Sequence, residues 1–99
     1  MKVQTKQEVI KILKDNSDRL TDFGVSSVGL FGSFVREEAT DESDVDLLII
    51  LEDYSWSNFC QLLDFTESLF ERKVDIITEG SITPNNGQRI CAEVEYVFN

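Results

Sequence analysis

The most constraining feature of the sequence is the segment DVDLLIIL at residues 44–51, in which Asp44 and Asp46 open a long apolar run. Successive side chains of a strand point to opposite faces, so a run that is apolar on both faces indicates a strand covered on both sides. The expected fold class is therefore α/β (α+β), with a mixed or largely parallel β-sheet flanked by helices. The 99 residues fit a single domain spanning 1–99.

The remaining periodicity predicts helices and strands that alternate along the chain. Trp56 shares helical spacing with Phe59 and Leu63 and is expected in the core. Pro84 is expected to break the chain before a short last helix. Helices are predicted over residues 5–22 and 33–38, from 55 or 57 to 71, and over 88–93. Strands are predicted over residues 25–31, 44–51, 73–78 and 94–98, the last at a sheet edge.

The composition excludes several classes of function. A formal charge of -10 argues against direct nucleic-acid binding through general electrostatic attraction, so a polyanionic ligand would need metal ions as intermediaries. With no histidine and no CxxC spacing, zinc sites and Cys-His pairs are excluded, and Cys60 and Cys91 are expected to be buried apolar residues. The sequence offers no signal-peptide h-region and no membrane span, which makes a cytoplasmic location the default expectation.

Three aspartates form the candidate metal site. Asp44 and Asp46 would project from the same face of their strand, and Asp75 is the second residue of another apolar run at Val74–Ile77. If the two strands are neighbours, the three carboxylates converge, and a divalent cation would offset their repulsion. Oxygen ligands without histidine favour magnesium, with manganese in its place as the other option. Solvated acids at strand ends are the alternative interpretation.

Gly32, Ser33 and Arg36 form a candidate phosphate site. A glycine between a strand and a helix permits close backbone approach, and the following helix N-terminus offers N–H groups to an anion. Arg36 in the first helical turn would be better placed with an anion nearby. The alternatives are that Ser33 only caps the helix and that Arg36 pairs with surface acids, namely Glu37, Glu38 or Asp41.

Three blocks of the sequence together resemble a known family. They are GLFGSFVREEATDESDVDLLII, KVDIITEGSITP and the ending IxxEVEYV, which together span most of the chain. The pattern of Gly-Ser, a spacer, Asp-x-Asp and a third Asp on a neighbouring strand is similar to that of the minimal nucleotidyltransferases of the DNA polymerase beta superfamily. The chain differs at Glu37, where relatives commonly carry glycine, and a carboxylate there is expected to crowd the phosphate end of the site.

The resemblance implies a polymerase-beta-like nucleotidyltransferase fold and a specific reaction. A nucleoside monophosphate, AMP from ATP, would be transferred to a hydroxyl of a protein acceptor with a pair of Mg²⁺ ions as cofactors. By the same resemblance Asp44, Asp46 and Asp75 would bind the metals, and Asp75 would help deprotonate the acceptor. Gly32 and Ser33 would hold the β- and γ-phosphates, with Arg36 as an auxiliary contact.

Stand-alone members of the family are often paired with a HEPN-type helical toxin, so the resemblance also implies an antitoxin of such a toxin–antitoxin pair. Two alternatives stay open. The chain could be a catalytically weak or inactive binding module that neutralises its partner by complex formation, or a cation-binding regulator without nucleotide chemistry. A homo-oligomer is compatible with each of them.

Overall fold

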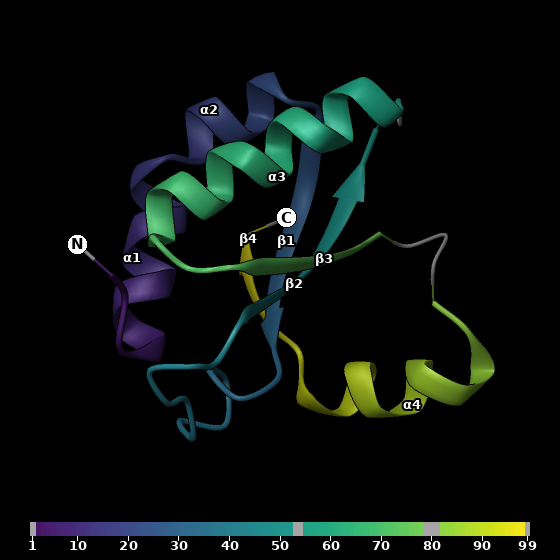
Figure 1. The fold of residues 1–99 in the computed structure, drawn as a ribbon. Coiled ribbons are helices and arrows are strands. Elements are labelled where there is room, and N and C mark those ends of the chain that lie inside the picture. Colours follow the sequence, from purple (N-terminus) through teal and green to yellow (C-terminus); the bar gives the residue numbers. More distant parts are fainter. Residues whose placement is uncertain (1, 53–54, 79–81, 99) are drawn as a thin grey trace.

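The computed structural model describes residues 2–52, 55–78 and 82–98. The elements run along the chain in the order shown in Figure 1. They are α1 (Lys6–Asp15), α2 (Ser17–Asp22), β1 (Val25–Phe31), β2 (Val45–Leu51), α3 (Trp56–Phe70), β3 (Val74–Thr78), α4 (Pro84–Glu93) and β4 (Glu95–Phe98). None of the helices within these described residues is long and apolar enough to cross a membrane.

The four strands form one sheet in the order β3-β2-β1-β4. Strand β1 is antiparallel to both β2 and β4, whereas β2 and β3 are parallel. The prediction of a mixed sheet flanked by helices is confirmed, and β2 lies inside the sheet as its two apolar faces require. Strand β4 lies at an edge, as predicted.

Two apolar clusters cover the two faces of β2. Its odd-numbered residues Val45, Leu47 and Ile49 belong to a large core that includes side chains of α1, α2 and α3. Leu48 points to the other face, where it packs with Phe31 of β1 and Ile90 of α4. Helix α4 therefore covers a face of the sheet different from the one covered by the first three helices (Figure 1). Asp46 is adjacent to Leu47, and side chains alternate between the two faces, so Asp46 lies on the face covered by α4.

The predicted helix over residues 5–22 is wrong in its continuity, because the chain forms two helices that meet at Asn16. The Asn16 side chain donates a 2.8 Å hydrogen bond to the Ile12 carbonyl. Asparagine competes in this way with the regular backbone bonds of a helix, and the first helix ends at the residue before it. The start of α1 carries a capping box between Thr5 and Glu8.

Helix α4 is longer than predicted, since Pro84 begins the helix and does not break it. The first helical position needs no backbone N–H partner, so proline is tolerated there. Trp56 was expected in the core, but its side chain is 70% exposed. Its helical spacing with Phe59 was read correctly, because the two rings stack at 5.8 Å between centroids, yet the first turn of α3 leaves Trp56 in solvent.

The cysteine expectations have separate outcomes. Cys60 is half-buried and not fully enclosed. The side chain of Cys91 lies outside the described part of the structure.

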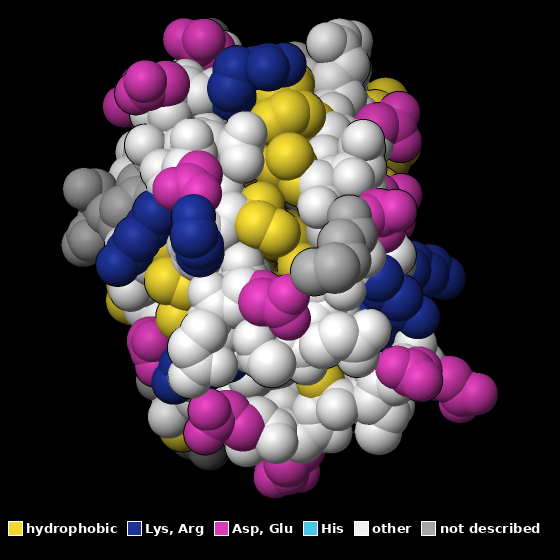
Figure 2. Space-filling model, turned by 90° about the vertical axis from the view of Figure 1, so that its left-hand side faces the viewer, with side chains coloured by type: hydrophobic (Ala, Val, Ile, Leu, Met, Phe, Trp, Pro, Cys, Tyr) yellow, Lys and Arg dark blue, Asp and Glu magenta, His cyan; other side chains and the backbone are white. Residues whose placement is uncertain are grey.

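One face of the molecule exposes both apolar and charged side chains (Figure 2). A narrow band of apolar side chains runs between acidic and basic groups on this face.

Candidate active site

The central feature of the candidate site is a pair of aspartates on neighbouring parallel strands. Asp46 of β2 and Asp75 of β3 are Cα partners in the strand register. Parallel strands lie about 4.8 Å apart, and paired residues point to the same face. Two residues further on, the partners Leu48 and Ile77 both pack in the cluster beneath α4. The two strands are neighbours, which was the condition for their carboxylates to converge, and the register places Asp46 and Asp75 on the α4 face.

Asp44 takes a different position from the other two aspartates. It is exposed and lies just before β2, whose first residue is Val45. Across residues 2–52, 55–78 and 82–98, no three acidic or cysteine side chains come close enough together to hold one metal ion. The structure thus brings Asp46 and Asp75 together and leaves Asp44 at the end of the preceding loop. The donor chemistry of the Asp46–Asp75 pair fits a hard divalent cation such as Mg²⁺, and Asp44 would have to turn toward the pair to join it.

Gly32 lies directly against the Asp46 carboxylate. It follows Phe31, the register partner of Asp46, and its φ is +77°, in the left-handed region that favours glycine. A Cβ atom built on Gly32 would meet Asp46 Oδ2 at 2.0 Å. Only a residue without a side chain allows this close approach. The glycine and the aspartate pair, which are distant in sequence, therefore meet at one place in the fold.

The predicted helix over residues 33–38 is wrong, because this segment forms a series of turns. The Arg36 N–H donates to the Gly32 carbonyl at 3.2 Å, and the Glu38 N–H donates to the Ser33 carbonyl at 2.9 Å. The second bond joins residues five positions apart, whereas an α-helical bond joins residues four positions apart. The segment therefore does not continue as an α-helix. The helix cap expected of Ser33 and the helix dipole expected at this site are consequently absent from the segment.

Arg36 and Gly32 share one partner that the sequence did not identify, the carboxylate of Glu93 at the end of α4. Arg36 Nη1 donates to Glu93 Oε1 at 2.6 Å, and the Gly32 N–H donates to Glu93 Oε2 at 3.3 Å. The hydrogen bond to Glu93 raises the pKa of Arg36 above its ordinary value. Of the predicted surface partners, Glu38 lies at 3.7 Å from Arg36 Nε. The only signal for Glu93 was its place in the IxxEVEYV block.

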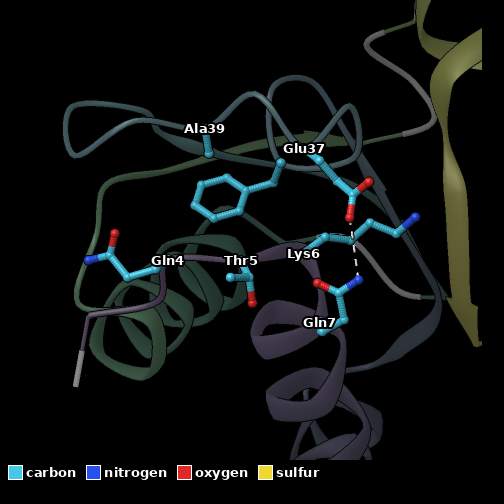
Figure 3. A pocket seen from close by; sticks show the side chains of 7 residues that line it. Gln4, Thr5, Lys6, Gln7, Glu37 and Ala39 are labelled. Atoms are coloured by element: carbon cyan, nitrogen blue, oxygen red, sulfur yellow. Dashed lines mark hydrogen bonds between the residues drawn. The ribbon is translucent and has the colours of Figure 1, made fainter.

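The Glu37 side chain turns toward α1, and the expectation that it crowds the phosphate end of the site stays a prediction. Glu37 Oε1 accepts a 3.4 Å hydrogen bond from Gln7 Nε2, as Figure 3 shows. Arg36, the preceding residue, contacts Glu93 of α4 instead. Glu37 borders a pocket of about 120 Å³ that is lined by Gln4, Thr5, Lys6, Gln7, Phe34, Glu37 and Ala39.

Glu37→Gly is expected to raise the free energy of unfolding by roughly 0.5–1 kcal/mol. Glu37 has a φ of +60°, which costs a residue with a Cβ about 1–2 kcal/mol, and the greater freedom of an unfolded glycine returns part of the gain. Urea unfolding followed by circular dichroism measures the change. Glu38→Gly is the matched control, because Glu38 has no positive φ and should lose stability. Loss of stability in both variants would contradict the strain at Glu37.

Comparisons with known proteins identify the family to which the chain is similar. The sequence profile of the nucleotidyltransferase domain family matches residues 6–97. The protein adenylyltransferase MntA of Thermococcus cleftensis is 35% identical over 99 residues, covering 98% of this chain and 100% of that protein. A solved structure provisionally described as a minimal nucleotidyltransferase has a TM-score of 0.79 at 25% identity, covering 92% of this chain and 94% of that chain.

A more distant neighbour shares the fold alone. It is a chain from the complex of the tri-AMPylated HEPN toxin of Shewanella oneidensis with an MNT antitoxin, with a TM-score of 0.61 at 19% identity, covering 95% of this chain and 69% of that chain. The family match spans nearly the whole chain, and the relative from Thermococcus cleftensis is similar from end to end. This protein therefore belongs to the nucleotidyltransferase domain family and is a nucleotidyltransferase of the minimal type.

Proposed function

We propose that this protein transfers AMP from ATP to a hydroxyl group of a protein acceptor, with Mg²⁺ as cofactor. The observation that carries the proposal is the register pairing of Asp46 with Asp75 on the α4 face, with Gly32 against the Asp46 carboxylate. The likeness to the adenylyltransferase MntA supports AMP as the transferred group. We treat residues 1–99 as one nucleotidyltransferase domain that acts in the cytoplasm.

Each candidate residue has a role in this reaction. Asp44 and Asp46 would hold the metal ions and orient the triphosphate, and Asp75 would complete the metal site and accept the proton of the acceptor hydroxyl. The acceptor oxygen forms a bond to the α-phosphorus, the bond from that phosphorus to the β-phosphate oxygen breaks, and pyrophosphate leaves. Bound Mg²⁺, or Mn²⁺ in its place, would offset the charge of the triphosphate and polarise its α-phosphoryl group.

Gly32, Ser33 and Arg36 would bind the β- and γ-phosphates. The Gly32 N–H and the Arg36 guanidinium already share an anionic partner in Glu93, which supports their ability to bind a phosphate oxygen. Arg36 is partly exposed, with 40% of its side chain accessible, so a triphosphate can reach it. Phosphate binding would require Arg36 to exchange or share its contact with Glu93.

The proposed acceptor is a HEPN-type helical toxin, which makes this protein the antitoxin of the pair. The solved complex of a HEPN toxin with an MNT antitoxin supports this choice of partner. The formal charge of -10 would favour association with a basic partner surface. The apolar band on the face in Figure 2 offers contact area of the kind that protein partners bury.

The experiment is transfer of radiolabel to a HEPN protein encoded in the same genomic neighbourhood. With [α-³²P]ATP and Mg²⁺ we expect label on the HEPN protein, on tyrosine, and with [γ-³²P]ATP none, because pyrophosphate carries the γ-phosphate away. Mass spectrometry locates the AMP group. Absence of α-label while the two proteins bind each other would contradict AMP transfer.

The second candidate function is a binding module that neutralises its partner by complex formation. The strong negative charge favours it, since charge complementarity alone could hold a basic toxin. The double variant Asp44→Asn with Asp46→Asn separates the two functions. We expect this variant to lose toxin neutralisation in a growth assay, and retained neutralisation would favour the binding module.

A further inference from the structure

Arg72 is a buried cation that bonds to two segments far from it in the sequence. The residue lies in the connection between α3 and β3, and it is only 7% exposed. Arg72 Nε donates to the Val3 carbonyl at 2.7 Å. Arg72 Nη1 donates to the carbonyls of Thr40 and Ser43 at 2.9 Å and 2.8 Å. One guanidinium therefore joins the N-terminal segment to the loop at residues 40–43.

This loop leads directly into the first of the three candidate aspartates. Ser43 precedes Asp44, and Val45 begins β2 with its N–H bonded to the Lys73 carbonyl at 3.0 Å. Arg72 precedes Lys73 and lies three residues before Asp75. The Arg72 side chain thus connects the segment that carries Asp44 to the strand that carries Asp75.

The same guanidinium also contacts the turn that carries Gly32. Its central carbon lies over the ring of Phe34, 5.0 Å from the centroid. Phe34 is 1% exposed and comes two residues after Gly32. Arg72 therefore contacts the turn that carries Gly32 and the loop before Asp44, and it lies just before the strand that carries Asp75.

A rigid guanidinium suits this position for a geometric reason. Its planar fork holds two donors in a fixed relation, whereas a lysine ammonium is one point on a flexible stem. Asp44 lies outside the regular bonds of β2, so the loop before it depends on such anchors. Three of the guanidinium's hydrogen bonds go to backbone carbonyls of two separate segments, so the side chain restrains both segments at once.

We propose that Arg72 is a positioning residue for the metal site, because it holds the loop at residues 40–43 where Asp44 can join Asp46 and Asp75 around a divalent cation. This inference rests on the proposed function. It assigns to Arg72 no contact with the nucleotide or the reacting atoms. Its effect is to order the backbone that leads into Asp44 before the cation arrives, and a segment that is already ordered loses less conformational freedom on binding.

The test compares Arg72→Lys with the wild-type protein and with Leu62→Ala. Leu62 is fully buried in α3, and its truncation lowers stability without touching the loop. The first readout is Mn²⁺ affinity, measured by electron paramagnetic resonance with the unreactive analogue α,β-methylene ATP. The second readout is amide hydrogen exchange of residues 40–45 without metal. Both are measured well below the melting temperature of each variant.

We expect Arg72→Lys to bind Mn²⁺ about tenfold or more weakly, a difference of about 1.4 kcal/mol in binding free energy. Exchange at residues 40–45 should become faster while the amides of β1 keep their protection. Leu62→Ala should keep wild-type Mn²⁺ affinity. Arg72→Met, which removes the charge but keeps much of the volume, should show the same loss if it folds.

Two results would overturn the inference. One is wild-type Mn²⁺ affinity and wild-type loop exchange in Arg72→Lys. The other is an equal loss of affinity in Leu62→Ala, which would trace the effect to general destabilisation. If the wild-type protein binds no Mn²⁺ with the analogue, the proposed function itself fails and the role of Arg72 fails with it.

Discussion

Gly32→Ala is expected to slow AMP transfer roughly a hundredfold and to lower stability. The new methyl group would meet Asp46 Oδ2 at 2.0 Å, so the carboxylate or the turn must move. The φ of +77° adds a strain of about 1–2 kcal/mol for a residue with a Cβ. A displacement of about 1 Å in a reacting group can cost roughly a hundredfold in rate, and here the displaced group would be a metal ligand. Radiolabel transfer and urea unfolding measure the two effects.

Gly24→Ala provides the matched control for this substitution. Gly24 has a φ of +88°, but a Cβ built there meets nothing within 4 Å. The control shares the backbone strain of Gly32→Ala without the contact with Asp46, so it should lose stability and keep its transfer rate. Equal transfer rates in the two alanine variants would contradict the close approach of Gly32 to the reacting centre.

Asp46→Asn is expected to remove transfer and to remove the stabilisation that bound metal and nucleotide give the wild-type protein. Loss of one metal-binding charge costs several kcal/mol of transition-state stabilisation, roughly a thousandfold in rate. Asp46 and Asp75 are adjacent carboxylates on paired strands, so the loss of either charge weakens the site that would hold the cation. Radiolabel transfer measures the rate, and thermal unfolding in EDTA and in Mg²⁺ with α,β-methylene ATP measures the stabilisation by the ligand. The wild-type protein should be stabilised by the ligand, and Asp46→Asn should not.

Asp75→Asn should behave like Asp46→Asn, because the two carboxylates form one pair. Asp64→Asn is the control, since Asp64 is an exposed acid on α3. It changes the net charge by the same amount at a distance from the pair. A similar loss of ligand-induced stabilisation in Asp64→Asn would attribute the effect to overall charge and contradict the pair as the binding site.

The sequence predicted those parts of the fold that depend on local pattern. The apolar run at Leu47–Leu51 required cover on both faces, and the structure supplies α1 to α3 on one and α4 on the other. The break at Asn16 and the turns at residues 32–37 were not predicted. Each depends on competition between regular helical hydrogen bonds and other local hydrogen bonds. The prediction for Pro84 was wrong because proline disrupts the interior of a helix but is favoured at its first position. The sequence alone did not show that Pro84 is the first residue of α4.

The same division applies to the site. Asp46 and Asp75 could be paired from the sequence because each is the second residue of its strand, and parallel neighbours bring such positions into register. The roles of Glu93 and Arg72 could not be predicted, because their contacts are distant in sequence. Glu93 contacts residues 57 and 61 positions away, and Arg72 contacts residues 29 to 69 positions away. Nothing in the local pattern around either residue indicates its partner. Tertiary packing alone makes these contacts.

The most direct test of the account is to locate the cation. Crystals grown with Mn²⁺ and α,β-methylene ATP allow the metal to be identified by anomalous scattering. We expect a peak between the carboxylates of Asp46 and Asp75, with Asp44 turned toward it and the triphosphate against the Gly32 turn. A bound nucleotide with its metal elsewhere, or with no metal near this pair, would contradict the account.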